Sequence, residues 1–542
     1  MRRALLAAIT LAFSAAQPAR GQNPAPLYPD LGNHHHGIST KVAQAQQYFD
    51  QGLRLTYGFN HAEAIRSFRA AQAADPKCAM CFWGEALAFG PNINAAMDSA
   101  SGVAAFAAVQ RAAALSDNAT SKERAYIAAL AKRYAADPAR GQAARDTQYA
   151  RAMQMLADMF PNDDDAHVLH ADAQMNLSPW DYYVAAKPKP NGAAALASLE
   201  RVVARSPEHA GACHFFIHAV EAVKPELAVP CAERLPQLMP GAGHIVHMPA
   251  HIYIRVGRYN DAIDRNVHAL HADEQHIADL APDGAYRLGY YPHNSHFLWF
   301  AATMAGREKT AVEAALKTRA LTNQEMLRVP GLGALQHYLV TPLYAYVRFG
   351  RWQDVLAEPS PPADLPYPLG VWHYARVLAY VATGDVSRAE TELRSLQAQR
   401  ESPALSGVTI WGLNSAKAVL DIAVEAAQAE IALKKGHVGT ALTHLRKGAE
   451  LEDALIYDEP PTWHLPVRHQ LGAVLLRAGL VKEAEQAYRE DLKRHPQNGW
   501  SLFGLAQALR ARNQLAQAQQ IETQLAQSWK GSDLNLKASY IP

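Results

Sequence analysis

The chain has 542 residues, with 52 lysines and arginines against 51 aspartates and glutamates, and hydrophobic residues make up 49% of it. A formal net charge of +1 argues against a nucleic-acid partner or an anionic membrane surface, since both attract strongly basic proteins. The apolar fraction favours closely packed helices over intrinsic disorder.

Residues 1–21 have the composition of a secretory signal peptide. Met1, Arg2 and Arg3 precede an apolar run at residues 4–16, and small residues follow it. This run is too short to span a bilayer, and no later stretch is apolar enough to be a transmembrane segment. We therefore expect an exported protein, periplasmic or secreted, in which disulfides are permitted.

Residues 22–40 form a leader rich in Pro, Gly and Asn, with three consecutive histidines, His34, His35 and His36. This composition favours a flexible His-containing tail. The alternative is that the leader folds back and supplies extra ligands to a binding site elsewhere in the chain.

A repeat with fixed spacing of small and large residues begins after the leader. Small residues allow two helices to cross closely, and a proline ends the second helix. One copy holds Gly52, Leu55, Ala64, Phe68, Ala71 and Pro76, and another holds Gly472, Leu475, Ala484, Tyr488 and Pro496 at the same offsets. A turn signal, Gly followed five residues later by Ala or Val, recurs at Gly257, Gly306, Gly350, Gly384, Gly436 and Gly479.

These positions resemble the tetratricopeptide repeat (TPR) family, most closely at 43–76 and 465–525. Segments such as H-M-P-A-H-I-Y-I-R-V-G-R-Y are also similar to a bacterial group of exported TPR proteins with His-rich motifs. The resemblance implies an all-α fold, a right-handed α-solenoid of antiparallel helix pairs with irregular insertions. We expect N-terminal helical repeats at 41–240, with the first TPR at 43–76, central TPR-like repeats at 241–445, and C-terminal TPR repeats at 446–542.

Cys78 and Cys81 stand where a helix is expected to begin, in the sequence C-A-M-C. Export makes a structural disulfide our main expectation for this pair. Buried thiols and a redox or metal-binding pair are the alternatives. Phe82 replaces the histidine that a c-type haem attachment site requires, so haem is not expected here.

Histidines, 24 in all, are concentrated on one face of the predicted repeats. In the TPR family, positions 2, 5 and 9 of each first helix face the concave groove, and these offsets lie on one side of a helix. The resemblance therefore implies an inward-facing set in three successive repeats. Its members are His244, His247 and His251, then His293 and His296, then His337.

His214, His218 and Glu221 lie at i, i+4 and i+7 on one helix face. Two histidines at i and i+4 can hold one metal ion. We predict that His214, His218, His244, His247, His251, His293 and His296 are metal ligands. Imidazole ligands favour Cu, Zn or Fe over Mg or Ca.

Further polar and aromatic residues are predicted to line the ligand groove. Asn and Trp clusters often bind ligands, although capping and core packing explain such residues equally well. The set is His337, Trp83, Asn92, Asn94, Trp180, Tyr290 and Tyr291.

Three functions remain open from the sequence. The first is an exported TPR solenoid whose concave groove binds a metal ion, a small ligand or a partner peptide through the histidine cluster. The second is a metal-dependent enzyme, an oxidoreductase or hydrolase, in which Glu221, a tyrosine or metal-bound water acts as acid or base. The third is a protein–protein interaction scaffold whose histidines only form hydrogen bonds. The expected partners are a small molecule, a peptide or a protein, and not a nucleic acid.

Overall fold

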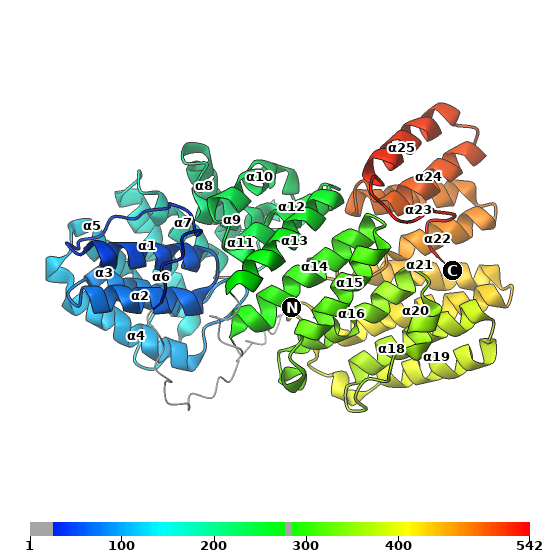
Figure 1. Ribbon diagram of the computed structural model, residues 1–542, viewed down its shortest axis with the longest axis horizontal. Helices are drawn as coiled ribbons and strands as arrows, with labels where there is room; N and C mark the ends of the chain where they lie inside the picture. The colour runs from blue at the N-terminus through cyan, green and yellow to red at the C-terminus, as the bar shows by residue number, and fades with distance from the viewer. Residues whose placement is uncertain (1–24, 277–283, 542) are drawn as a thin grey trace. The chain divides into compact units, whose positions relative to one another are not determined.

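Figure 1 shows the chain as a computed structural model, which describes residues 25–276 and 284–541. The predicted signal peptide at residues 1–21 lies outside these described residues. The structure divides into two compact units within the range of the predicted central repeats. We call described residues 25–252, 268–276 and 284–286 the N-terminal unit, and residues 253–267 and 287–541 the C-terminal unit.

The N-terminal unit consists of consecutive helices that pack against one another. Alternate helices also touch, as α1 with α3 and α7 with α9, which is the contact pattern of stacked helix pairs. The helices are α1 (Ala43–Tyr57), α2 (His61–Ala74), α3 (Ala79–Ala88), α4 (Ser99–Ala114), η1 (Ser116–Asn118), α5 (Ser121–Leu130), α6 (Gln142–Met159), α7 (Asp164–Met175), α8 (Pro190–Arg205), α9 (Ala210–Val220), η2 (Pro225–Ala228), α10 (Val229–Leu238) and α11 (Gly243–His247).

The C-terminal unit has the same organisation, since α16 packs on α18, α18 on α20 and α22 on α24. Three helices, α12 (Pro249–Arg255), α13 (Tyr259–His276) and η4 (Tyr286–Tyr290), contribute residues to both units. The remaining helices are α14 (Tyr291–Met304), α15 (Glu308–Leu321), η5 (Gln324–Met326), α16 (Gly333–Arg348), α17 (Trp352–Ala357), α18 (Pro366–Thr383), α19 (Val386–Arg400), η6 (Pro403–Leu405), α20 (Ala416–Lys434), α21 (Val438–Asp453), α22 (Val467–Arg477), α23 (Val481–Arg494), α24 (Gly499–Ala511) and α25 (Leu515–Ser528).

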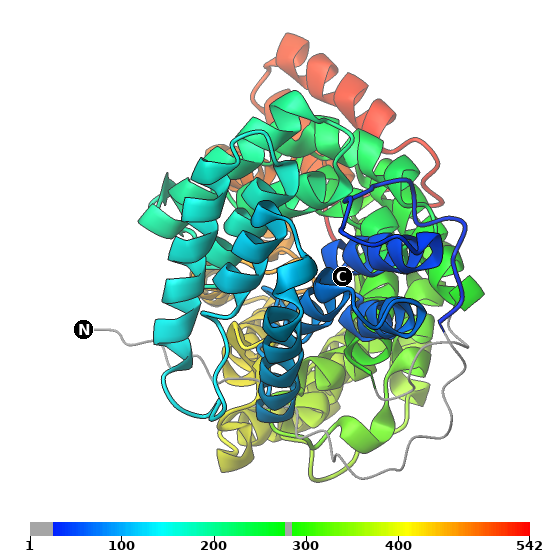
Figure 2. The same cartoon turned by 90° about the vertical axis from the view of Figure 1, so that its left-hand side faces the viewer.

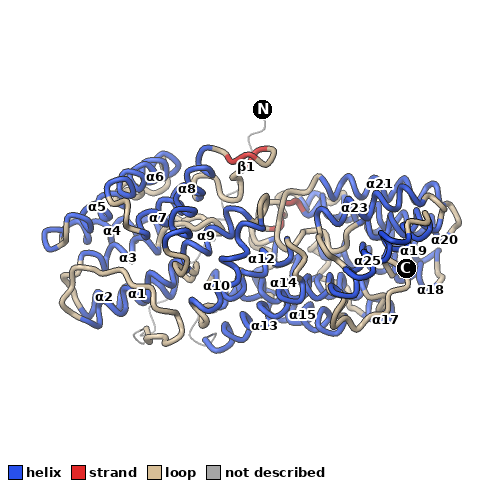
Figure 3. The backbone as a smooth tube through the Cα atoms, turned by 90° about the horizontal axis from the view of Figure 1, so that it is seen from above, coloured by secondary structure: helices blue, strands red, loops and turns tan. Residues whose placement is uncertain are grey.

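Strand structure in the described residues is limited to two short antiparallel pairs, drawn red in Figure 3. Strand β1 (Tyr183–Val184) pairs with β2 (Lys187–Pro188), and β3 (Thr409–Ile410) pairs with β4 (Asn414–Ser415). The prediction of an all-α repeat fold is confirmed. Among the helices that the structure describes, each is too short or too polar to cross a membrane.

An aromatic ring held between two glycines fixes the spacing of the first repeat. The buried Phe68 ring lies against Gly52 of its own repeat and Gly84 of the next. A Cβ atom would stand 2.7 Å from this ring at Gly52 and 2.3 Å from it at Gly84, closer than such contacts allow. The small and large positions of the predicted repeat are therefore the positions where helices meet.

The predicted turn glycines also have the backbone conformation that a sharp helix–helix turn requires. A residue with positive φ at this point is strained unless it lacks a Cβ atom. Gly257, Gly306, Gly350, Gly384, Gly436 and Gly479 all have φ between 66° and 93°.

The leader, dark blue in Figure 1 and Figure 2, runs alongside α1 and is packed rather than flexible. Arg54 Nε donates a hydrogen bond to the carbonyl oxygen of His34 at 2.7 Å, and Gln46 Nε2 donates to that of His36 at 2.9 Å. The ring of His36 is only 6% exposed. The expected tail therefore differs from the structure, because polar groups of distant helices bind the leader.

Two disulfides are present. Cys78 pairs with Cys81 at the start of α3, and Cys213 pairs with Cys231, joining α9 to α10. The first pair is the disulfide that we expected from the sequence.

A buried polar chain crosses the C-terminal unit. Arg348 Nη2 donates to His469 Nδ1 at 3.1 Å, and His469 Nε2 donates to Asp491 Oδ2 at 2.9 Å. Burial lowers the pKa of His469 to about 4; Asp491 opposes this shift and Arg348 adds to it. His469 is therefore neutral in the folded protein at pH 7.

The close contact between glycine and an aromatic ring predicts that adding one methyl group at that glycine lowers the free energy of unfolding. Tyr488 lies between Gly472 and Gly504, and a Cβ at Gly504 would stand 2.1 Å from its ring. We expect Gly504→Ala to lower the free energy of unfolding by about 1–3 kcal/mol, the usual cost of overpacking, in urea denaturation. Gly439→Ala is the control, since no described atom lies within 4 Å of its Cβ position, and it should not destabilise the fold. Equal effects of the two changes would contradict this packing.

The neutral state of His469 predicts acid sensitivity. Its folded-state pKa lies below the ordinary value of 6.5, so between these values the unfolded chain binds a proton that the folded chain does not. Stability therefore falls as the pH drops from 6.5 towards 4. Between pH 7 and pH 5, His469 should account for about 2 kcal/mol of lost unfolding free energy. Urea denaturation at both values should show a drop smaller by this amount in His469→Gln than in the unchanged protein.

Candidate metal centre

Five histidines and one glutamate form a buried cluster in the N-terminal unit, which we call the histidine centre. Helix α9 and the residue after it supply His214, His218 and Glu221, while α11 and α12 supply the rest. Each side chain comes from a residue that is at most 3% exposed. The other members are His244, His247 and His251.

Hydrogen bonds fix which nitrogen of each ring carries the hydrogen. His214 Nδ1 lies 2.6 Å from the carbonyl oxygen of Tyr57, which can only accept, so this nitrogen donates. His218 Nδ1 donates to Glu221 Oε1 at 3.1 Å. His251 Nδ1 lies 2.9 Å from Glu221 Oε2 in an ion-pair contact, and the negative carboxylate favours the ring hydrogen on this nitrogen. In the neutral rings, the lone pair available to a metal ion is therefore on Nε2.

The Nε2 atoms of His214 and His218 are buried and find no hydrogen-bond partner among the described residues. Together with a ring nitrogen of His244, each of these histidines offers a ligand atom within 4.8 Å of the others. Unpartnered buried nitrogens are costly, and a metal ion would satisfy those of His214 and His218 at once. This trio can therefore hold a transition metal.

Aromatic rings surround the trio. Phe59 stacks on His218 at 5.9 Å and on His244 at 5.6 Å between ring centroids. Trp180, a predicted groove residue, meets the His218 ring edge-on at 5.2 Å. These apolar walls limit the access of water to the ring nitrogens.

The charge of the centre suits a cation. Burial lowers the pKa of His214 well below its ordinary value, and the neighbouring His218 adds to this effect. Burial also lowers the pKa of His244, again with help from the neighbouring imidazoles. Burial raises the pKa of Glu221, but His251 and His218 outweigh it and lower the pKa to about 2. The ionised Glu221, beside the neutral rings of His214 and His244, attracts a cation to this site.

A second cluster surrounds Asp165 of α7, and we call it the leader cluster. Asp165 Oδ1 accepts from Tyr57 Oη at 2.5 Å, from His34 Nε2 at 3.0 Å and from His209 Nε2 at 3.2 Å. Its Oδ2 accepts from His36 Nδ1 at 2.6 Å. Burial raises the pKa of Asp165, but His34 and His209 reverse this and hold it well below its usual range. One carboxylate thus binds two leader histidines.

The leader cluster has the wrong hydrogen placement for a metal. His209 caps α9, and its Nδ1 accepts from the backbone N–H of Ala212 at 3.2 Å. The hydrogen of the neutral ring is therefore on Nε2, which faces Asp165 and donates to it. Although His34, Asp165 and His209 are close enough to bind an ion, we interpret them as a hydrogen-bonded anchor for the leader.

Two predicted ligands, His293 and His296, belong to the C-terminal unit. The His296 ring lies 5.3 Å from that of His337, and His337 Nδ1 lies 2.6 Å from the hydroxyl of Tyr367. The predicted groove residues Tyr290 and Tyr291 stand just before these histidines, at the junction of η4 and α14.

Three predicted groove residues, Trp83, Asn92 and Asn94, form packing or turn contacts within the N-terminal unit. Trp83 is 2% exposed and packs against Phe49 and Tyr126. Asn92 Oδ1 accepts from the backbone N–H of Asn94 at 2.9 Å and so closes a turn. These contacts match the packing and capping interpretation of the three residues.

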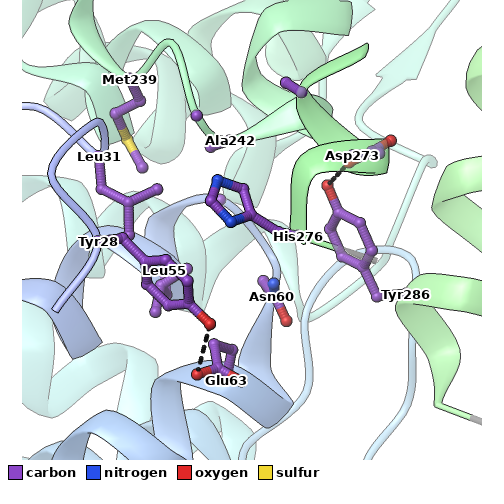
Figure 4. A pocket seen from close by; sticks show the side chains of 13 residues that line it. Tyr28, Leu31, Leu55, Asn60, Glu63, Met239, Ala242, Asp273, His276 and Tyr286 are labelled. Atoms are coloured by element: carbon purple, nitrogen blue, oxygen red, sulfur yellow. Dashed lines mark hydrogen bonds between the residues drawn. The ribbon is translucent and has the colours of Figure 1, made fainter. Parts of the chain in front are cut away.

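A hollow lies beside the histidine centre in the N-terminal unit (Figure 4). Tyr286 Oη accepts from the backbone N–H of His244 at 3.0 Å and donates to Asp273 Oδ1 at 2.7 Å. On the opposite wall, Tyr28 Oη donates to Glu63 at 3.2 Å. Tyr286 therefore fixes the start of α11, which carries two histidines of the centre.

Sequence reasoning missed Tyr57, Phe59 and Asp165. Tyr57 ends α1, Phe59 lies in the turn that follows, and both have the sequence character of ordinary core residues. The triple histidine of the leader was a visible signal, and its partner Asp165 was not, because 131 residues separate it from His34.

No family model matches the chain, and no curated protein matches its sequence. Among solved structures, the human IFIT1 dimer with m7Gppp-AAAA is similar at 12% identity, with 90% of each chain covered and a TM-score of 0.31. The Cut9-Hcn1 hetero-tetramer of APC/C is similar at 14% identity, with 86% of this chain and 76% of that chain covered and a TM-score of 0.29. The helix pairs, turn glycines and interlocked rings of this chain are those of a TPR-like fold.

Proposed function

We propose that the N-terminal unit binds a transition-metal ion through His214, His218 and His244. The observation that carries this proposal is the hydrogen placement. Tyr57 and Glu221 accept the Nδ1 hydrogens of His214 and His218, so the lone pairs of these rings are on Nε2, and the three histidines offer ligand atoms within 4.8 Å of one another. A partner that orients the second nitrogen is the usual companion of a metal-binding histidine.

Copper and zinc are the ions that this ligand set supports best. Imidazole nitrogens suit borderline metals, and three of them leave a position open for water or another ligand. Iron is the third candidate, although non-haem iron more often takes two histidines and a carboxylate.

Glu221 acts in this proposal as a positioning residue. Its Oε1 accepts a hydrogen bond from His218, its Oε2 forms an ion-pair contact with His251, and its low pKa keeps it ionised. It therefore orients His218 and His251 and strengthens them as ligands. This arrangement supports a positioning role over the acid–base role that the sequence suggests.

The cellular address belongs to the same proposal. The signal-like composition of residues 1–21 supports export, and two disulfides fit an oxidising compartment. A TPR-type scaffold outside the cytoplasm would then carry the metal, with protein or peptide partners on its other surfaces.

Loss of one ligand should abolish tight metal binding. We expect the chain, purified without a polyhistidine tag, to bind Cu²⁺ or Zn²⁺, and His214→Ala or His244→Ala to weaken binding at least about 100-fold. Competition titration with a chromophoric chelator measures the affinity. His271→Ala is the matched control, because His271 is exposed on α13 of the same unit. Unchanged affinity in both ligand variants, with helicity preserved by circular dichroism, would remove the proposal and leave an interaction scaffold.

The positioning role predicts a smaller effect for Glu221→Gln. The amide cannot accept from both histidines, so His218 and His251 lose part of their orientation. We expect metal affinity to fall about 10–100-fold without being lost. The same competition titration checks this. An affinity equal to that of the unchanged protein would show that the carboxylate does not support the ligands.

A further inference from the structure

Two histidines of the centre lie outside the proposed trio and face each other. His247 ends α11, and His251 lies in α12 after an intervening proline. Their Nε2 atoms are 2.8 Å apart, and the two residues are 0% and 3% exposed. A pair of imidazoles this close and this buried needs either a shared hydrogen or a shared cation.

Glu221 separates this pair from the trio. Its Oε1 accepts from His218 Nδ1, and its Oε2 lies 2.9 Å from His251 Nδ1 in an ion-pair contact. The two nitrogens of an imidazole point in nearly opposite directions, so each ring directs its Nε2 away from Glu221. The His218 Nε2 lies with His214 and His244, whereas the His251 Nε2 lies with His247. The carboxylate therefore stands between two separate points where ring nitrogens meet.

The hydrogen placement again favours a metal ligand. The carboxylate 2.9 Å from His251 Nδ1 favours the ring hydrogen there, so in the neutral ring the Nε2 that faces His247 carries the lone pair. Without a metal, His247 Nε2 donates its hydrogen to this lone pair. When an ion binds both nitrogens, that hydrogen moves to the other ring nitrogen of His247, and the two lone pairs bind the ion.

The spacing of the pair fits two ligands on one ion. Metal–nitrogen bonds of roughly 2.0–2.1 Å at a right angle place the two nitrogens about 2.9 Å apart. The observed 2.8 Å is close to this value. Right angles between ligands are typical of Cu²⁺ and Ni²⁺ in nitrogen sites, whereas tetrahedral Zn²⁺ spreads its ligands further.

We infer that His247 and His251 form a second metal position, so that the centre takes two ions, one on each side of Glu221. This inference rests on the proposed function of the trio. The pair gives the second position two of its ligands, and further donor groups complete its coordination. Because one carboxylate orients a histidine of each position, Glu221 also couples the affinities of the two ions.

Counting ions tests the inference. The full chain without a tag is stripped with a chelator, loaded with Cu²⁺ and dialysed against a weak competitor that removes surface ions. Metal analysis should give two ions per chain in the unchanged protein and in the His271→Ala control. We expect one ion in His247→Gln, one in His244→Ala and none in the double variant. Circular dichroism verifies that each variant keeps its helicity.

The outcomes separate the two proposals. One ion in the unchanged protein, lost in either single variant, would mean that five histidines share one site, which overturns the second position and keeps metal binding. Two ions retained in His247→Gln would also overturn it. No tightly held ion in any form would remove both proposals. If His247→Gln fails to fold, the break point of a Cu²⁺ titration of the unchanged protein, at one or two equivalents, decides the question.

Discussion

The contact between Tyr57 and Gly211 is the constraint on which the N-terminal unit depends. A Cβ at Gly211 would stand 2.6 Å from the Tyr57 ring, so only glycine allows α1 to approach α9 this closely. At that distance the Tyr57 carbonyl reaches His214, and its hydroxyl reaches Asp165. One residue therefore sets the hydrogen placement of the histidine centre and helps to anchor the leader.

The two histidine clusters show why proximity alone does not identify a metal site. In the leader cluster, a backbone N–H occupies the lone pair of His209, so its other nitrogen must donate. In the histidine centre, carbonyl and carboxylate oxygens take the hydrogens instead, which leaves lone pairs facing one another. Similar residues at similar distances thus support opposite interpretations, and the partner of the second ring nitrogen distinguishes them.

Local spacing explains how much of the fold could be predicted. Turn glycines and interlocking aromatic rings depend on residues of one repeat and the start of the next, and the structure has them where the sequence indicates. Helix periodicity also predicted that His214 and His218 lie on one face of α9. This prediction needs only the spacing of four residues within one helix. The bond from His214 to Tyr57 spans 157 residues, and no local pattern encodes it. The packing of the leader could not be predicted for the same reason. The composition of the leader is typical of a flexible segment, and it does not indicate that the distant carboxylate of Asp165 binds the leader.

The anchored leader changes where the folded body of the protein begins. Helical-repeat arrays need a polar cap at each end, because a terminal pair has no neighbour to cover it. Residues 25–42 cover one side of α1 and place His34 and His36 on Asp165, so they serve as such a cap although they contain no helix. Truncation at the first recognisable repeat would leave Asp165 with two of its four donors and an ionised carboxylate partly uncovered. The boundary of the domain is therefore set by Asp165 and not by the repeat motif.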